Sequence, residues 1–324
     1  MQKIMRVLAG LALAGGLATA ASAQTKWDMP TPYPDANFHT QNIIHFTADV
    51  KKATGGKLVI QVHSAGSLIK HPEIKRAVRQ GIAPIGEVLV SLAANEAPVY
   101  GFDSIPFLAT GYAGAKKLYA AQKPYLEKQL AKEGLMLLWS EPWPPQGIYA
   151  KKELKSMGDL KGLKFRTYNT FTGRIAALSG AIPTQVEVPD IPTAFATGRV
   201  EAMITSPSTG ANTKAWDYLT YYHDTQAWLP RNMVFVNKAA FDKLSADQKK
   251  ALLDAAKVAE GRGWKASEAE TIEKTKVLKD HGIKIITPSA ELKKGFAEIG
   301  AKIAAEWEAK AGADGKAMLA AYRK

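Results

Sequence analysis

The stretch that organises this chain is Gly162-Leu163-Lys164-Phe165-Arg166-Thr167-Tyr168-Asn169. Its apolar or small residues alternate with Lys164 and Arg166, which is the period of a β-strand with two different faces. Arg166 therefore stands near the end of a predicted strand, where ligands bind in α/β domains. A guanidinium at that place can hold a carboxylate through two parallel hydrogen bonds. A solvated or salt-bridged surface arginine is the alternative that this stretch alone leaves open.

Strands and helices alternate on both sides of this stretch. Predicted strands cover residues 57–63, 88–92, 135–139, 147–150, 183–188, 200–204 and 233–237, and predicted helices cover 42–52, 72–81, 115–133, 172–179 and 190–197. Elements of these lengths in this order predict an α/β fold with mostly parallel sheets and helices on both faces. The second half repeats the pattern of the first without repeating its sequence, so we expect two domains.

The last third of the chain is predicted to be mainly helical. Ser245 and Gln248 form a capping box, and the helix that they open extends to Asp280. A helix of this length exceeds the globular norm, so we expect it either to bend near Gly261 and Gly263 or to span both domains. A final amphipathic helix or helix pair follows residue 287.

The N-terminus carries the features of a secretory signal peptide. Lys3 and Arg6 precede an apolar run over residues 7–20, and Ala21-Ser22-Ala23 supplies an A-x-A cleavage site. A membrane anchor is the alternative, but the run is shorter than the roughly 20 residues that a spanning helix needs. We expect cleavage after Ala23 and a mature protein in the periplasm.

Composition limits the classes of partner. The chain has no cysteine, which excludes disulfides and thiol chemistry, and its hydrophobic content of 46% is ordinary for a globular protein. Removal of Lys3 and Arg6 lowers the net charge from +13 to +11, which still favours anionic partners. The lysines are spread over helix faces without an aromatic-interleaved cluster, so nucleic acid is a poor candidate. Small organic anions remain.

Five segments in order support a resemblance to a known family, and they are Val50-x-x-Ala53-x-Gly55-Gly56-Lys57-Leu58, Ile105-Pro106-Phe107, residues 159–166, Gly198-Arg199-Val200-Glu201-Ala202 and Val236-Asn237. The chain resembles the DctP-type extracytoplasmic substrate-binding proteins of TRAP transporters. The resemblance implies a two-domain periplasmic binding protein fold, with a cleft between the domains and a long helix that spans both. It places residues 24–144 and about 231–271 in domain I, and about 145–230 and 272–324 in domain II.

The same resemblance implies a set of ligand-binding residues. Arg166 matches the arginine that pairs with the substrate carboxylate, and Glu87 matches a polar pocket position of the first domain. Ser206 stands where asparagine is common in the family. Gln146 replaces a second arginine that is common in sialic-acid binders, which argues against that substrate class. A solvated surface carboxylate is the alternative for Glu87.

Aromatic residues surround these positions and complete the predicted site. The predicted aromatic walls are Phe38, Trp143, Tyr149, Tyr168, Phe171 and Trp228, and the set also includes Asn169 and Asn232. One arginine among aromatic walls suits an aromatic or branched monocarboxylate of the 2-oxo, 2-hydroxy or phenylpropenoate type. A C4-dicarboxylate or a sugar acid is the alternative ligand, although either would require more polar groups.

An enzyme is the competing class of protein. The histidines show no metal-ligand spacing, and no G-x-S-x-G elbow occurs. Gly261-x-Gly263-x-x-Ala266 matches a dinucleotide fingerprint superficially but lies inside a predicted helix, where we interpret it as flexibility. We therefore expect no catalysis, cofactor or metal, and a monomer that delivers an organic acid to the small and large TRAP membrane subunits. A receptor that presents its ligand to a sensor protein would share this fold.

Overall fold

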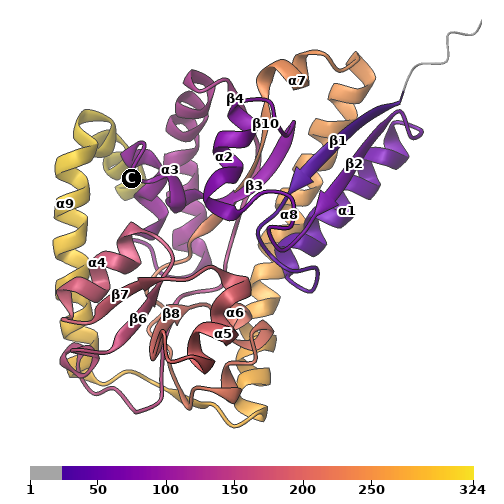
Figure 1. Cartoon of the computed structure of the whole chain (residues 1–324). Coiled ribbons are helices and arrows are strands. Elements are labelled where there is room, and N and C mark those ends of the chain that lie inside the picture. Colours follow the sequence, from indigo (N-terminus) through magenta and orange to yellow (C-terminus); the bar gives the residue numbers. More distant parts are fainter. Residues whose placement is uncertain (1–23) are drawn as a thin grey trace, which may run out of the picture.

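The computed structural model describes residues 24–324, which form two lobes stacked one above the other (Figure 1). The predicted signal peptide, residues 1–23, lies outside the described residues. Within residues 24–324, no helix is both long enough and apolar enough to cross a membrane.

The first lobe holds two small sheets with helices around them. β1 and β2 pair in parallel, and β3, β10 and β4 form a three-stranded sheet in that order. The strands are β1 (Thr25–Pro30), β2 (Leu58–His63), β3 (Ile85–Leu89), β4 (Leu135–Pro142) and β10 (Arg231–Asn237). The helices are α1 (Phe38–Ala53), α2 (His71–Arg79), α3 (Gly111–Lys132) and α7 (Lys238–Asp242), with 3-10 turns η1 (Val90–Ala93) and η2 (Pro98–Ser104).

The second lobe is built on one six-stranded sheet with the order β11-β9-β5-β8-β6-β7. Its strands are β5 (Gly147–Ala150), β6 (Lys164–Thr167), β7 (Ile182–Gln185), β8 (Ala202–Thr205), β9 (Tyr221–His223) and β11 (Lys284–Ile286). Its helices are α4 (Thr170–Leu178), α5 (Ile191–Ala196) and α6 (Pro207–Asn212), with 3-10 turns η3 (Met157–Leu160), η4 (Val188–Asp190) and η5 (Ala215–Asp217).

The six-stranded sheet is mixed and the three-stranded sheet is antiparallel, whereas the sequence predicted mostly parallel sheets. β5 runs antiparallel to β8 and β9, and β10 runs antiparallel to β3 and β4. Both strands enter their sheet directly from the other lobe, so each runs against its neighbours instead of returning through a crossover helix. The parallel pairs β6–β7 and β6–β8 lie where the predicted βαβ pattern is clearest.

Helix α8 (Ala246–Asp280) is continuous over 35 residues and spans both lobes along one side of the molecule (Figure 1). Ser245 and Gln248 form the predicted capping box at its start. It packs on α1 and β4 of the first lobe and on α6 of the second. Of the two predicted alternatives for this helix, spanning both domains is therefore confirmed, without a break at either glycine.

The glycine motif of α8 serves packing. A Cβ on Gly263 would lie 1.3 Å from Glu141 Oε2 and 2.5 Å from its Cδ, so glycine at this position leaves room for the buried Glu141 carboxyl group. A Cβ on Gly261 would meet nothing within 4 Å. Our interpretation of the motif as a source of flexibility is thus wrong for Gly263.

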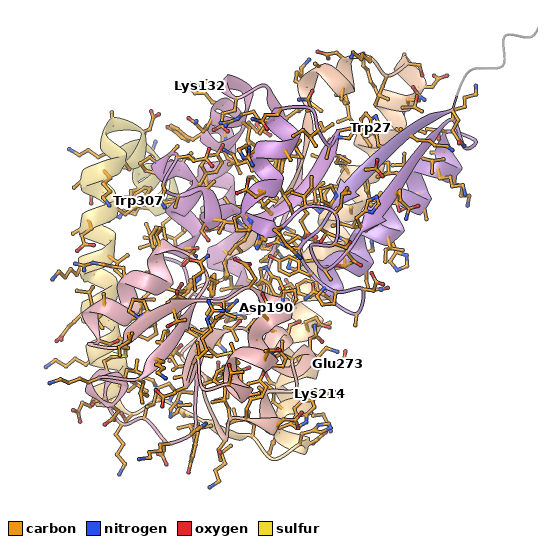
Figure 2. The ribbon with its side chains drawn as sticks, in the orientation of Figure 1. Trp27, Lys132, Asp190, Lys214, Glu273 and Trp307 are labelled. Atoms are coloured by element: carbon orange, nitrogen blue, oxygen red, sulfur yellow. The ribbon has the colours of Figure 1, made fainter. Side chains whose placement is uncertain are left out.

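Helix α9 (Ala290–Arg323) runs along the opposite side of the molecule (Figure 1). It packs on α4 and η3 of the second lobe and on η2 and α3 of the first. Trp307, labelled on this helix in Figure 2, donates from Nε1 to Pro98 O over 2.8 Å. Gly312 interrupts the helix with φ 58°, and Tyr322 beyond it donates to Leu108 O. Residues 272–324, predicted as part of domain II, thus contact both lobes.

Two chain segments cross between the lobes and pair with each other. One joins β4 to β5, and the other joins β9 to β10. Trp143 N donates to Pro230 O over 2.8 Å, Gln146 N donates to Trp228 O over 3.0 Å, and Ala227 N donates to Gln146 O over 3.1 Å. This paired connection forms the floor between the lobes and places Trp143, Gln146 and Pro230 at the site described next.

Candidate functional site

A cavity with about 360 Å³ of empty space, part of it open to solvent, lies between the lobes, at the carboxyl ends of strands from both lobes. The lining is formed by Tyr33, His71, Leu89, Trp143, Gln146, Arg166, Tyr168, Glu187, Val188, Thr205, Ser206, Thr209 and Pro230. Asp190, labelled between the lobes in Figure 2, marks the turn that follows Glu187.

Arg166 is the fixed cation of this cavity. It lies in the middle strand of the β8-β6-β7 group and is 1% exposed. Its Nε donates to Val186 O over 2.8 Å, and its guanidinium lies 4.9 Å from the centre of the Tyr168 ring. Within residues 24–324, Nη1 and Nη2 take part in no hydrogen bond or ion pair, so both can serve a ligand. Burial lowers the pKa of Arg166, although an arginine remains charged at any physiological pH.

Glu187 and His71 form a pair that joins the two lobes across the cavity. Nδ1 of His71 and Oε2 of Glu187 are 2.8 Å apart. Leu89 N donates to the other ring nitrogen, Nε2, over 3.2 Å. Burial raises the pKa of Glu187, but the hydrogen bond from His71 and the charge of Arg166 act against it, and the pKa is lowered overall. The cavity therefore contains an ionised carboxylate as well as an arginine.

Asn232 holds the two aromatic walls of the first lobe. Its Oδ1 accepts from Trp143 Nε1 over 2.9 Å and from Tyr33 Oη over 3.2 Å. Its Nδ2 donates to Glu87 Oε1 over 2.7 Å, and Thr31 donates to the other oxygen of the same carboxylate. Glu87 thus orients Asn232, and Asn232 orients the rings that face the cavity.

The remaining predicted lining residues are held by the second lobe and the crossing segments. Tyr168 Oη donates to Gln146 Oε1 over 2.9 Å, and Gln146 Nε2 donates to Pro144 O. Ser206 caps α6, because its Oγ accepts from Thr209 N over 3.1 Å. Five predicted residues therefore meet at one cavity, and they are Trp143, Gln146, Arg166, Tyr168 and Ser206.

Seven predicted residues lie outside the lining, and they are Phe38, Glu87, Tyr149, Asn169, Phe171, Trp228 and Asn232. Glu87 and Asn232 stand behind the wall, as described above. Tyr149 packs on Tyr222 in the core of the second lobe, with ring centres 4.5 Å apart. Asn169 caps α4 and donates from Nδ2 to Ser91 Oγ over 2.8 Å, which links the lobes outside the cavity.

The aromatic members of this group have packing roles. Phe38 is the first residue of α1 rather than a loop residue, and its ring lies against Trp143 from behind, with centres 5.4 Å apart. Phe171 packs against Gly101 of the first lobe, and Trp228 belongs to the crossing segment itself, with its side chain buried in the core. We predicted a cavity walled mainly by aromatic side chains with few charges. The actual lining is more polar than this, because it also includes Glu187 and His71.

Sequence reasoning missed eight lining residues, which are Tyr33, His71, Leu89, Glu187, Val188, Thr205, Thr209 and Pro230. The rule that placed Arg166 could have found Glu187, because it follows β7, the parallel neighbour of β6. The predicted strand 183–188 included Glu187 and so hid it from that rule. The same rule could have found Leu89, which is the last residue of β3, and Tyr33, which lies shortly after the end of β1.

A buried cluster behind the cavity wall contains the residues of the described chain that could hold a metal ion. His39, Glu87 and Glu141 each offer a ligand atom, and these atoms lie within 4.8 Å of one another. His39 Nδ1 is 3.2 Å from Glu141 Oε1 without hydrogen-bond geometry. Burial raises the pKa of Glu87 and raises that of Glu141 to about 8, while burial lowers the pKa of His39 to about 4. These shifts favour the uncharged form of all three side chains.

Two α/β lobes, joined by crossing strands around a buried cavity with a fixed cation, define a two-lobed solute-binding protein. The sequence profile of Bacterial extracellular solute-binding protein, family 7 (DctP), matches residues 32–310, and the chain belongs to this family. The predicted family and the predicted two-domain fold are thus confirmed. It is a periplasmic family of transport proteins rather than a class of enzymes.

Three solved structures are similar to this chain over almost their whole length. DctP6 of Bordetella pertussis, an extracytoplasmic solute receptor binding pyroglutamic acid, is 50% identical with a TM-score of 0.91, over 92% of this chain and 99% of its own. DctP7 of the same organism, also binding pyroglutamic acid, is 47% identical with a TM-score of 0.91, over 93% and 100%. A marine metagenome TRAP protein specific for pyroglutamate is 44% identical with a TM-score of 0.91, over 93% and 99%.

Proposed function

We propose that this protein is a TRAP solute receptor that captures pyroglutamate, a small cyclic lactam with one carboxylate, between its lobes. The observation that carries the proposal is Arg166, a buried arginine whose Nη1 and Nη2 face the cavity without a partner among the described residues. A bidentate guanidinium pairs with one carboxylate. The pyroglutamate ligands of three receptors that are 44–50% identical support the choice of acid.

The predicted ligand class needs refinement in this light. A single carboxylate on a compact ring agrees with the expected monocarboxylate, whereas a lactam replaces the expected 2-oxo, 2-hydroxy or phenylpropenoate body. Glu187 argues against a C4-dicarboxylate, because a second ligand carboxylate would meet its negative charge.

Capture requires no chemical change of the ligand. The carboxylate binds Arg166 in the second lobe, and contacts to Tyr33 and His71 in the first lobe favour the closed arrangement. TRAP solute receptors work with membrane subunits, and we propose that the small and large subunits recognise the closed form of this protein. Each monomer carries its own complete site.

Isothermal titration of the purified chain from Gln24 to Lys324 tests this function. The protein is first dialysed from denaturant and refolded, so that any ligand retained from the cell is removed. Pyroglutamate is then compared with succinate, galacturonate and phenylpyruvate, which represent the alternative ligand classes. We expect binding at micromolar or lower concentration for pyroglutamate alone. Binding of a dicarboxylate or sugar acid without pyroglutamate would overturn the proposal and leave the family assignment intact.

A further inference from the structure

We propose that Glu187 is a specificity-determining residue whose carboxylate accepts a hydrogen bond from a ligand N–H, so that the cleft selects monocarboxylates with an N–H next to the acid group. This inference rests on the proposed function and deepens it. It identifies the group of a lactam acid, the ring N–H, that the protein recognises in addition to the carboxylate.

Glu187 and Arg166 are held next to each other by one strand register. β6 and β7 pair in parallel, with Arg166 opposite Thr184, and Arg166 Nε donates to the carbonyl of Val186. Glu187 is the next residue and lines the same cavity. A cation and an anion thus stand at neighbouring strand ends without forming an ion pair with each other, which suits a ligand that offers both an acceptor and a donor.

The hydrogen bonds of His71 determine what Glu187 can do. Leu89 N donates to His71 Nε2, so this nitrogen is the acceptor of the neutral ring and the proton is on Nδ1. Nδ1 therefore donates to Glu187 Oε2 over 2.8 Å. The other oxygen, Oε1, accepts only a long bond of 3.4 Å from Gln185 Nε2 among the described residues. Oε1 therefore keeps a strong acceptor site on a residue that lines the cavity.

An ionised carboxylate accepts hydrogen bonds and donates none. The lowered pKa of Glu187 keeps it in this form at neutral pH. A lactam N–H can donate to Oε1, whereas the ring oxygen of the corresponding lactone would point its lone pairs at the same oxygen. Since a hydrogen bond to a charged group contributes about 1.5–3 kcal/mol, the lactam should bind at least about tenfold more tightly than the lactone.

The experiment compares two ligands that differ in one atom. Pyroglutamate and 5-oxotetrahydrofuran-2-carboxylate, its lactone with oxygen in place of the ring N–H, are titrated into the wild-type chain and into the variant Glu187→Gln. Glutamine keeps the size of the side chain and can still accept from His71, but its amide can donate to the lactone oxygen. Glu201→Gln, in the same lobe but at the opposite end of the sheet beside Lys164 N, is the matched control.

We expect the wild type and Glu201→Gln to prefer the lactam by about tenfold or more, and Glu187→Gln to lose or reverse that preference. The ratio of the two affinities is decisive, because a general effect on lobe closure through His71 would weaken both ligands equally. Equal binding of both ligands by the wild type would overturn this inference and leave the proposed function standing. The inference is also overturned if Glu187→Gln keeps the wild-type ratio, whereas binding of neither ligand by the wild type would overturn the proposed function itself.

Discussion

Replacing Arg166 with lysine tests the centre of the site without removing its charge. All three nitrogens of the guanidinium have a role, because Nε donates to Val186 O while Nη1 and Nη2 remain available for the carboxylate. A lysine ammonium is a single point of charge on a flexible stem and cannot reproduce the planar fork. It can satisfy either the Val186 carbonyl or one carboxylate oxygen with good geometry.

The expected loss of affinity follows from that count. One charge-assisted hydrogen bond to the ligand contributes about 1.5–3 kcal/mol. The buried carbonyl of Val186, if left unpaired, costs about another 1 kcal/mol. Together these effects give about 3 kcal/mol, which corresponds to a roughly 100-fold increase in Kd for pyroglutamate. No discount for solvent applies, because the side chain is 1% exposed.

Isothermal titration measures this change, and circular dichroism checks that the variant is folded. Arg174→Lys is the matched control, since Arg174 lies on α4 with 40% of its side chain exposed and pairs with Glu306. We expect the control to change affinity by less than about twofold, as an exposed ion pair contributes little. If Arg166→Lys binds pyroglutamate within about threefold of the wild type, Arg166 does not hold the carboxylate through its fork and the reasoning is refuted.

Three further predictions concern stability. Burial raises the pKa of Glu141 from 4.5 to about 8, so between these pH values the folded protein keeps a proton that the unfolded chain has released. The free energy of unfolding should therefore fall as the pH rises from about 5 to 8. Urea titrations should show that Glu141→Gln removes about 1.5 kcal/mol of this fall between pH 6.5 and 8. Gly263→Ala should destabilise the fold by about 3 kcal/mol, because its Cβ meets Glu141 Oε2, whereas Gly261→Ala in the same helix should stabilise it by about 0.5–1 kcal/mol. Asn232→Ala should cost about 3 kcal/mol in chemical unfolding, since it leaves three buried polar partners unsatisfied.

Each of these predictions has an outcome that would contradict it. Equal pH dependence of the wild type and Glu141→Gln would mean that another group takes up the proton. Equal stability of the two glycine variants would mean that β4 can move away from α8 at little cost. Unchanged stability of Asn232→Ala would show that water replaces the amide.

The sequence predicted helices and strands well where a capping side chain or an alternation of apolar and polar residues marks them. The capping box of Ser245 and Gln248 marked the start of α8, and the alternation around Arg166 identified β6 and its end at the cavity. The direction of β5 and β10 could not be read locally, because it depends on which lobe each strand arrives from. The same long-range arrangement decides whether an aromatic ring such as Tyr149 faces a cavity or a core.

The site was therefore predicted in part. A strand-end rule located Arg166, yet an error of three residues at the end of β7 concealed Glu187. His71 gave no local signal, since its role depends on contacts with Leu89 and Glu187, far away in sequence. Glu87 was predicted as a pocket residue but lies behind the cavity wall, because Asn232, which it orients, holds Tyr33 and Trp143 in front of it.

The two long helices limit how the lobes can move. α8 and α9 lie along opposite sides of the molecule and each contacts both lobes, while the paired crossing segments form a third connection between them (Figure 1). Three connections at separate places oppose twisting and sliding of one lobe on the other and leave mainly one degree of freedom, a rotation that opens or closes the cleft. Under the proposed function, ligand capture then changes a single distance, the spacing of the outer rims of the lobes. A membrane partner that spans both rims would therefore detect an occupied cleft by fit alone, whatever small acid lies inside.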